Sequence, residues 1–227
     1  MHAVTHPQPA FEEGAATLAE RAYQRLREEI IRVELPPGTL LRDDDLMVRM
    51  GIGRTPVREA VQRLHSDGFV TILPRRGTLV SEINITDLAA IYEVRMHLES
   101  WASRLAAQRV TPEDRSEIAT LLDALAAVSS EDGFAALLDL DRRVHRFVYR
   151  CAKNSYLAKT LDLYHDLSLR ILYIAMKRYP MLTPRLEDVV HEQRTVLDAI
   201  ARGDAATAER VAVAHIAKFE AAIRQVI

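Results

Sequence analysis

The chain of 227 residues contains one cysteine, Cys151, and no run of 18 apolar residues. A single cysteine excludes a framework of disulfides within the chain. The lack of a long apolar run excludes a membrane-spanning helix. Residues 1–14 do not follow the basic-then-apolar pattern of a signal peptide and are predicted to be a disordered leader. A cytoplasmic protein is therefore expected.

The chain also has little net charge. The formal value of −2 argues against a general affinity for nucleic acid. Residues 15–81 nevertheless hold eleven cations against nine carboxylates, and all eleven are Arg. The planar guanidinium of Arg suits bidentate contacts with bases and phosphates. Because the excess is small, an assignment to DNA has to rest on a motif.

Residues 51–80 carry the most informative motif. Thr55 and Pro56 predict a helix start as cap and first residue, which leaves Arg54, Thr55 and Arg58 on its exposed side. After Gly68, two short apolar runs flank Pro74-Arg75-Arg76-Gly77 and predict a hairpin with a basic tip. Such a helix fits a DNA major groove, with Arg75, Arg76 and Gly77 on the backbone or minor groove. The competing interpretation, arginines that merely decorate a surface helix, does not explain why cap, proline, arginines and hairpin occur in order.

The remaining pattern is helical. Helices are expected at 17–33 and from Asp43 to Gly51, so residues 15–82 predict a winged helix-turn-helix. No strand pattern follows it. Further helices are expected at 86–109, 112–128, 133–151, 155–177, 183–202 and 205–226. The predicted fold is mainly α, with the winged unit followed by an antiparallel all-helical bundle over residues 83–227.

Three histidines of the bundle stand out. Asp141 and His145 are four residues apart and project from one helix face. His191 and His215 lie near the middle of later helices, beside apolar neighbours that suggest a core. Three imidazoles and a carboxylate could hold a divalent metal, with zinc first and nickel, manganese or iron(II) as alternatives. Taken singly, each histidine is more often a core residue bonded to a backbone carbonyl.

Two arginines of the bundle are candidate ligands for a small acid. Arg95 lies close to the apolar stripe Ile91, Val94 and Leu98. It could pair with Glu99, its i+4 neighbour, or hold the carboxylate of a small molecule. Arg170 lies in a similar apolar setting and presents the same two alternatives.

The segment Arg54–Ala60, followed by Leu64, Asp67-Gly68 and Gly77, resembles the DNA-binding signature of the GntR family of bacterial regulators. Arg95, the Asp141/His145 pair, Asn154, His191 and His215 resemble, in that order, its FadR-type branch with an FCD domain. Six bundle helices indicate the VanR-like subgroup. Where some members place an Arg at the start of the second helix, this chain has Asp43–Asp45.

The resemblance implies a homodimer that binds a palindromic operator. It also implies that Asp141, His145, His191 and His215 hold a metal beneath an effector cavity, with Arg95 on an effector carboxylate. We therefore expect a metabolite-responsive transcriptional regulator, with repression as the expected mode, rather than an enzyme. Two alternatives remain at this point. The Asp/His site could serve a metalloenzyme, or the metal could be purely structural.

Overall fold

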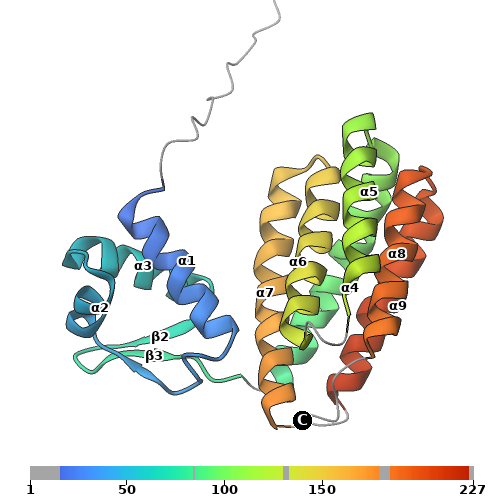
Figure 1. Ribbon diagram of the computed structural model, residues 1–227. Helices are drawn as coiled ribbons and strands as arrows, with labels where there is room; N and C mark the ends of the chain where they lie inside the picture. Colours follow the sequence, from blue (N-terminus) through green and yellow to red (C-terminus); the bar gives the residue numbers. More distant parts are fainter. Residues whose placement is uncertain (1–15, 84, 130–132, 179–184, 225–227) are drawn as a thin grey trace, which may run out of the picture.

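The computed structural model describes residues 16–83, 85–129, 133–178 and 185–224, so the predicted leader lies outside the described residues. A small winged unit lies beside an upright bundle of helices (Figure 1). The predicted fold class, mainly α with a winged helix-turn-helix and a helical bundle, is confirmed. None of the described helices is both long and apolar enough to cross a membrane.

The winged unit has a helical half and a small sheet. Its elements are α1 (Leu18–Ile31), β1 (Leu40–Leu41), α2 (Asp43–Met50), α3 (Arg54–Ser66), β2 (Val70–Leu73) and β3 (Gly77–Val80). Leu26 of α1, Leu64 of α3 and Phe69 are fully buried and form the centre of its core. Gly51 ends α2 in the left-handed conformation, φ 64°, as the sequence predicted.

The sheet contains one strand that the sequence pattern did not indicate. The order is β1-β3-β2, all antiparallel, with Leu40 opposite Leu79 and Leu41 opposite Thr78. Gly77 begins β3 with φ 105°, and a Cβ there would lie 3.1 Å from Leu40 Cδ1. Gly77 therefore has a structural role, because only glycine suits both this backbone and the close approach of β1.

The bundle consists of α4 (Ile85–Arg109), α5 (Pro112–Ala127), α6 (Gly133–Cys151), α7 (Ser155–Arg178), α8 (Leu186–Ala201) and α9 (Ala205–Arg224). The helix α4 packs against α6, α7, α8 and α9 and is therefore central. The predicted spans agree with these bounds within three residues. Thr183, where the fifth predicted span begins, lies outside the described residues.

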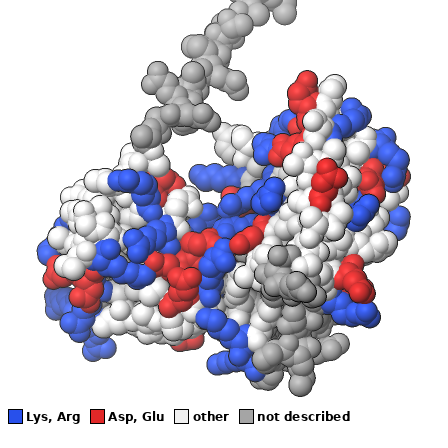
Figure 2. Space-filling model, in the orientation of Figure 1, with Lys and Arg blue, Asp and Glu red and all other residues white. Residues whose placement is uncertain are grey.

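The winged unit and the bundle share one apolar core and one ionic cluster. Leu26 and Phe69 belong to the same buried cluster as Leu88 of α4 and Ile171 of α7. Beside it, Asp166 of α7 is completely buried and pairs with Arg27 of α1 at 2.8 Å and Arg142 of α6 at 2.7 Å, with Arg146 farther away at 3.8 Å. Basic and acidic side chains gather between the winged unit and the bundle in the space-filling view (Figure 2).

Candidate functional site

The recognition helix α3 presents its predicted residues to solvent. Arg54, Thr55 and Arg58 are all exposed, while Val57, Val61 and Leu64 face the core. The helix starts two residues earlier than predicted: Gly53 is the N-cap, and Arg54 is the first helical residue. The predicted capping role of Thr55 is therefore wrong. Pro56 is tolerated because it lies in the first turn, where backbone N–H groups have no helical acceptor.

Both arginines of α3 pair with acidic residues of α2. Arg54 donates to Asp44 at 2.7 Å, and Arg58 donates to Asp43 at 3.0 Å. All four side chains are at least 31% exposed, so these pairs are weak and can be exchanged for other partners. The carboxylates hold the guanidinium groups at the N-terminal end of α3, where a groove-binding helix contacts base edges.

A groove of about 620 Å³ separates α3 from the hairpin formed by β2 and β3, here called the wing. Arg75 and Arg76 are exposed at the wing tip, and Arg75 has φ 64°. Arg42, the residue before α2, lines the same groove together with Arg58. Arg42 was not among the predicted DNA-binding residues, because it directly precedes the acidic run Asp43–Asp45. The chain therefore has a cation at the N-cap of α2, one residue before the acidic positions Asp43–Asp45.

The second site lies inside the bundle. Asp141 and His145 of α6 and His215 of α9 are buried, and one potential ligand atom from each lies within 4.8 Å of the others. The predicted convergence of these three residues is thus observed. The rings of His145 and His215 have centroids 5.4 Å apart.

The structure does not bring His191 to this cluster. His191 is exposed on α8, whereas Val189 and Gln193 are buried. Positions two apart on a helix differ by about 200°, so His191 points away from the side that carries Gln193. The expectation that His191 faces the core is therefore wrong. Gln193 contacts the site instead: its Nε2 donates to Asp141 and lies 3.4 Å from His145 Nε2.

A third imidazole comes from α7. His165 is buried, its Nε2 lies 3.5 Å from Asp141 Oδ2, and its ring centroid is 4.6 Å from that of His145. His165 was not among the residues that the sequence predicted to bind a metal. A usable signal existed, because His165 falls between Leu161 and Leu169 at four-residue spacing on the buried face of α7.

Two carboxylates orient the ligand histidines. Glu99 of α4 lies 2.9 Å from His145 Nδ1, and Glu192 of α8 lies 2.8 Å from His215 Nδ1. When a ring donates through Nδ1, its Nε2 lone pair is free to bind a cation. Carboxylate-bound imidazoles of this kind are usual around protein-bound metals. The donor set and its surroundings therefore fit a divalent metal.

Neighbouring charges of opposite sign shift the pKa values of the buried cluster towards the charged forms. Burial alone would raise the pKa of Asp141, but the neighbouring imidazoles outweigh it and hold that pKa below the usual value. Burial would likewise raise the pKa of Glu99, yet Arg95 and His145 hold it well below its usual range. Burial lowers the pKa of His165, but Asp141 and Asp166 raise it further than burial lowers it. Asp141 and Glu99 are therefore anionic at neutral pH.

Arg95 lies beside this cluster and already has partners. Its guanidinium pairs with Glu99 at 2.6 Å and donates to Ser168 Oγ. The cavity that Arg95 lines with the histidines, here called the inner cavity, has a volume of only about 20 Å³. This is about the space of one water molecule or ion. The structural alternative predicted for Arg95, an ion pair with Glu99, is observed.

Arg170 lies elsewhere. It is 1% exposed and donates to the backbone oxygen of Ser81, at the end of the winged unit. Arg95 and Arg170 therefore do not share a cavity.

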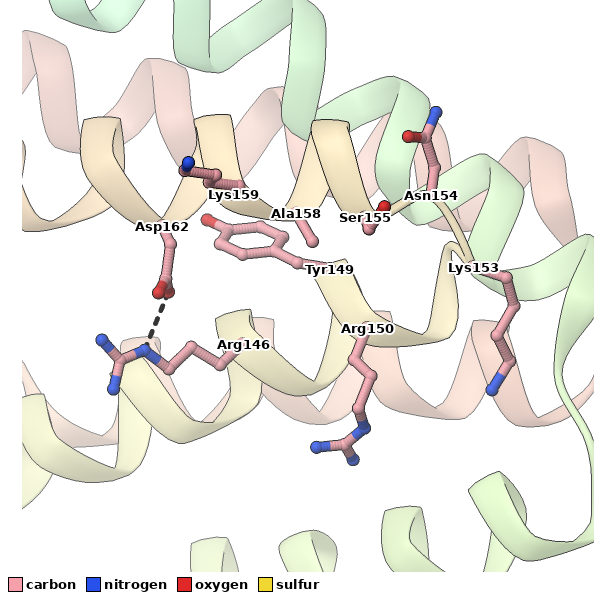
Figure 3. A pocket seen from close by; sticks show the side chains of 9 residues that line it. All are labelled: Arg146, Tyr149, Arg150, Lys153, Asn154, Ser155, Ala158, Lys159 and Asp162. Carbon is pink, nitrogen blue, oxygen red and sulfur yellow. Dashed lines mark hydrogen bonds and ion pairs between the residues drawn. The ribbon is translucent and has the colours of Figure 1, made fainter. Parts of the chain in front are cut away.

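A third hollow, of about 670 Å³, is an open groove on the outside of α6 and α7 (Figure 3). Arg146, Arg150, Lys153 and Lys159 surround it, and Arg146 pairs with Asp162 at 2.8 Å. Tyr149 lines the groove, and its hydroxyl lies 3.3 Å from His145 Nδ1. Tyr149 is thus the side chain between this groove and the inner cavity.

An exposed arginine-bearing recognition helix, a basic wing and a helical second domain define a winged-helix DNA-binding protein. Comparison with protein families gives the same division. The family of bacterial regulatory proteins called gntR matches residues 18–80, and the FCD domain matches residues 90–218. The chain belongs to the gntR family of transcriptional regulators, in the branch with an FCD domain. Both regions are those of regulators, so the metalloenzyme alternative is not retained.

Named relatives agree with this assignment. The chain is 27% identical to a probable D-xylose utilization operon transcriptional repressor of Paenarthrobacter nicotinovorans, over 89% of this chain and 87% of that protein. It is 23% identical to the transcriptional repressor RspR of Escherichia coli, over 91% and 89% of the two chains. The solved structure of E. coli McbR/YncC shares the fold, with a TM-score of 0.81 and 22% identity over 93% of this chain and 99% of that one.

Proposed function

We propose that this regulator is a repressor that binds a palindromic operator as a homodimer and responds to a small carboxylic acid. The main support for DNA binding is the groove between α3 and the wing, which is lined by Arg42, Arg58, Arg75 and Arg76. One winged unit offers one recognition helix, and two such helices read half-sites about 34 Å apart. The repressors among its relatives support the proposed mode of action.

The DNA contacts are testable on α3 itself. Arg58→Ala should weaken binding to a specific promoter fragment by about 1–3 kcal/mol, because a base-reading guanidinium is lost. Arg63→Ala is the matched control: Arg63 is also exposed on α3, but it pairs with Glu20 and stacks 4.0 Å from the Tyr23 ring centre. Fluorescence anisotropy at fixed salt measures both. Equal losses for the two variants would contradict the assignment of the reading face.

We further propose that Asp141, His145 and His215 hold a divalent metal, with His165 as the additional imidazole in place of His191. A set of three nitrogens and one oxygen suits zinc first, with nickel, manganese or iron as alternatives. A bound metal would cross-link α6, α7 and α9 and offer a Lewis-acidic position for a carboxylate oxygen. A purely structural metal is the second candidate, and the small volume of the inner cavity favours it.

Elemental analysis of purified protein tests this ligand set. His215→Ala should lose most of the bound metal. His191→Ala should retain it, because His191 is exposed on the other side of α8. A loss of metal in His191→Ala as large as that in His215→Ala would restore the ligand set expected from the sequence and contradict the present one.

Arg95 is proposed to bind the effector carboxylate at the inner cavity. An acid entering there has to replace Glu99 on the guanidinium, and the cavity has to widen beyond about 20 Å³. His165 and Asp166 offer a route from this site to the winged unit. His165 lines the inner cavity, and Asp166, the next residue, pairs with Arg27 of α1. A shift of α7 at His165 would therefore move an anchor of the winged unit.

A further inference from the structure

A separate cavity of about 450 Å³ lies where the winged unit meets α4 and α7; we call it the junction pocket. Gly68, Ser81 and Glu82 come from the winged unit. Asp87, Ile91 and Val94 of α4 and Leu167 and Arg170 of α7 are among its other walls. The junction pocket and the inner cavity have no lining residue in common among the described residues. Its volume lies within the range of small-molecule sites, about 300–1,000 Å³.

Arg170 differs from the other residues that line this pocket, because it is a buried cation. It is 1% exposed, and among the described residues it forms no ion pair; its Nε has no hydrogen-bond partner there. Its one hydrogen bond is to a neutral acceptor, the Ser81 carbonyl oxygen. Burial lowers the pKa of Arg170 to about 10, and Glu82 offsets this only in part. The buried Arg27 and Arg95, by contrast, each pair with a carboxylate. A buried cation without a counterion is costly, so an anion is favoured beside it.

We propose that the junction pocket binds a small monocarboxylate with an apolar body, its carboxylate on Arg170. Ile91, Val94 and Leu167 supply the apolar wall. Glu82 and Asp87, both exposed on the same pocket, would repel a second negative charge on the ligand, which favours a monocarboxylate over a dicarboxylate. This inference rests on the proposed response to a carboxylic acid, and it adds to the proposed inner-cavity site a second carboxylate site whose volume already suffices.

The position of the pocket links binding to the DNA-reading unit. Gly68 follows the C-cap of α3, Asp67, so one wall is the end of the recognition helix. The facing walls belong to the bundle. A molecule held between them would fix the angle between the winged unit and the bundle, and a change in that angle would alter the spacing of recognition helices in a dimer.

Isothermal titration of the full-length protein with 4-methylpentanoate tests the proposal, with 4-methylpentan-1-ol as the uncharged probe of the same body. Arg170→Met removes the guanidinium while keeping a long apolar side chain. Ala90→Trp fills the pocket from an exposed position of α4 without touching Arg170, and it serves if Arg170→Met fails to fold. Arg95→Met reports on the inner cavity.

The acid should bind and the alcohol should bind at least about tenfold more weakly, because a hydrogen-bonded charge pair is lost. Arg170→Met and Ala90→Trp should each weaken binding of the acid at the junction pocket by about tenfold or more. Arg95→Met removes only the inner-cavity site, so titration of that variant should still show binding at the junction pocket. Loss of binding in Arg95→Met alone would overturn the junction site and leave the proposed inner-cavity effector site standing. No binding of the acid to the unaltered protein would overturn the junction site. The proposed function is tested separately, by the measurements of promoter binding and metal content.

Discussion

At the scale of single residues, the arginines proposed to read DNA pair with carboxylates in the protein alone. Asp43 and Asp44 sit opposite Arg58 and Arg54, and DNA phosphates or base edges have to replace them. Exposed pairs of this kind contribute little, about 0.2–1 kcal/mol, so the replacement costs little affinity. The acidic residues nevertheless disfavour binding to arbitrary duplex, because each unreplaced carboxylate lies near a phosphate.

Asp43→Asn should therefore strengthen binding to random duplex by about two- to fivefold at low salt, because one repulsive charge and one competing partner are removed. Asp45→Asn is the matched control, since Asp45 is exposed in the same first turn of α2 and makes a similar contribution to the helix terminus. Anisotropy titrations with a random fragment measure the effect. An equal gain in both variants would point to net charge alone.

The metal-site residues show what single-residue reasoning can and cannot provide. The i, i+4 spacing of Asp141 and His145 was sufficient to place both on one face. The prediction for His191 was wrong because its apolar neighbours Val189 and Val190 lie on different sides of α8, and of these two only Val189 is buried. The phase of α8 is fixed by Val189, Gln193, Val196 and Ile200, a pattern that was visible in the sequence. His165 could have been found by the same test applied to α7.

At the scale of elements, the capped start of α5 is tied to the turn between α6 and α7. Thr111 and Asp114 form a reciprocal capping box, and Asp114 also lies 2.9 Å from Lys153. Burial alone would raise the pKa of Asp114, but Lys153 and the Thr111 backbone outweigh it and lower that pKa to about 2. A carboxyl with a lowered folded-state pKa stabilises the fold above its unfolded pKa, near 4, and loses this effect as pH falls.

Asp114→Asn should therefore reduce the free energy of unfolding most at pH 5–7, and the difference from the unaltered protein should shrink as pH falls from about 4 towards 2. Urea unfolding at a series of pH values measures this difference. Asp123→Asn, at an exposed position of the same helix, is the control. A difference for Asp114→Asn that stays constant between pH 6 and pH 3 would contradict the role assigned to the ionised carboxylate.

The helices were predictable because their ends carry local signals. Pro112 after Thr111, Asn154 before Ser155 and Gly203 after Ala201 mark boundaries that need no tertiary information. The strand β1 was not predictable, since two residues have no periodicity and Leu40–Leu41 is a strand only through its pairing with β3. The start of α3 was misplaced by two residues because Gly53 can cap a helix without a side chain.

At the scale of the whole molecule, the winged unit is anchored to the bundle by ion pairs as well as by the shared core. Arg32 pairs with Asp139 at 2.6 Å, and Arg142 reaches both Glu28 and Asp166. The members of the Arg32–Asp139 and Arg142–Glu28 pairs are more than 100 residues apart in the chain. Sequence alone could place the two units next to each other but could not pair their surfaces, because no local pattern connects such distant residues.

Asp166→Ala should destabilise the protein by about 3–5 kcal/mol, because Arg27 and Arg142 would remain as buried charges without their shared partner. Glu187→Ala, which breaks the exposed pair with Arg185, should change stability by less than about 0.5 kcal/mol. Thermal or denaturant unfolding compares the two. A loss for Asp166→Ala as small as that for Glu187→Ala would show that the interface does not depend on this carboxylate.

The ionic cluster at the junction also limits how freely this regulator can be recombined with its relatives. A chimaera that joined residues 16–83 to a foreign FCD domain would bring Arg27, Glu28 and Arg32 without Asp139, Arg142 and Asp166. Three charged side chains would then face an unmatched surface. A working graft would have to transplant both halves of the cluster together, so these six positions form one unit of exchange although they belong to two domains.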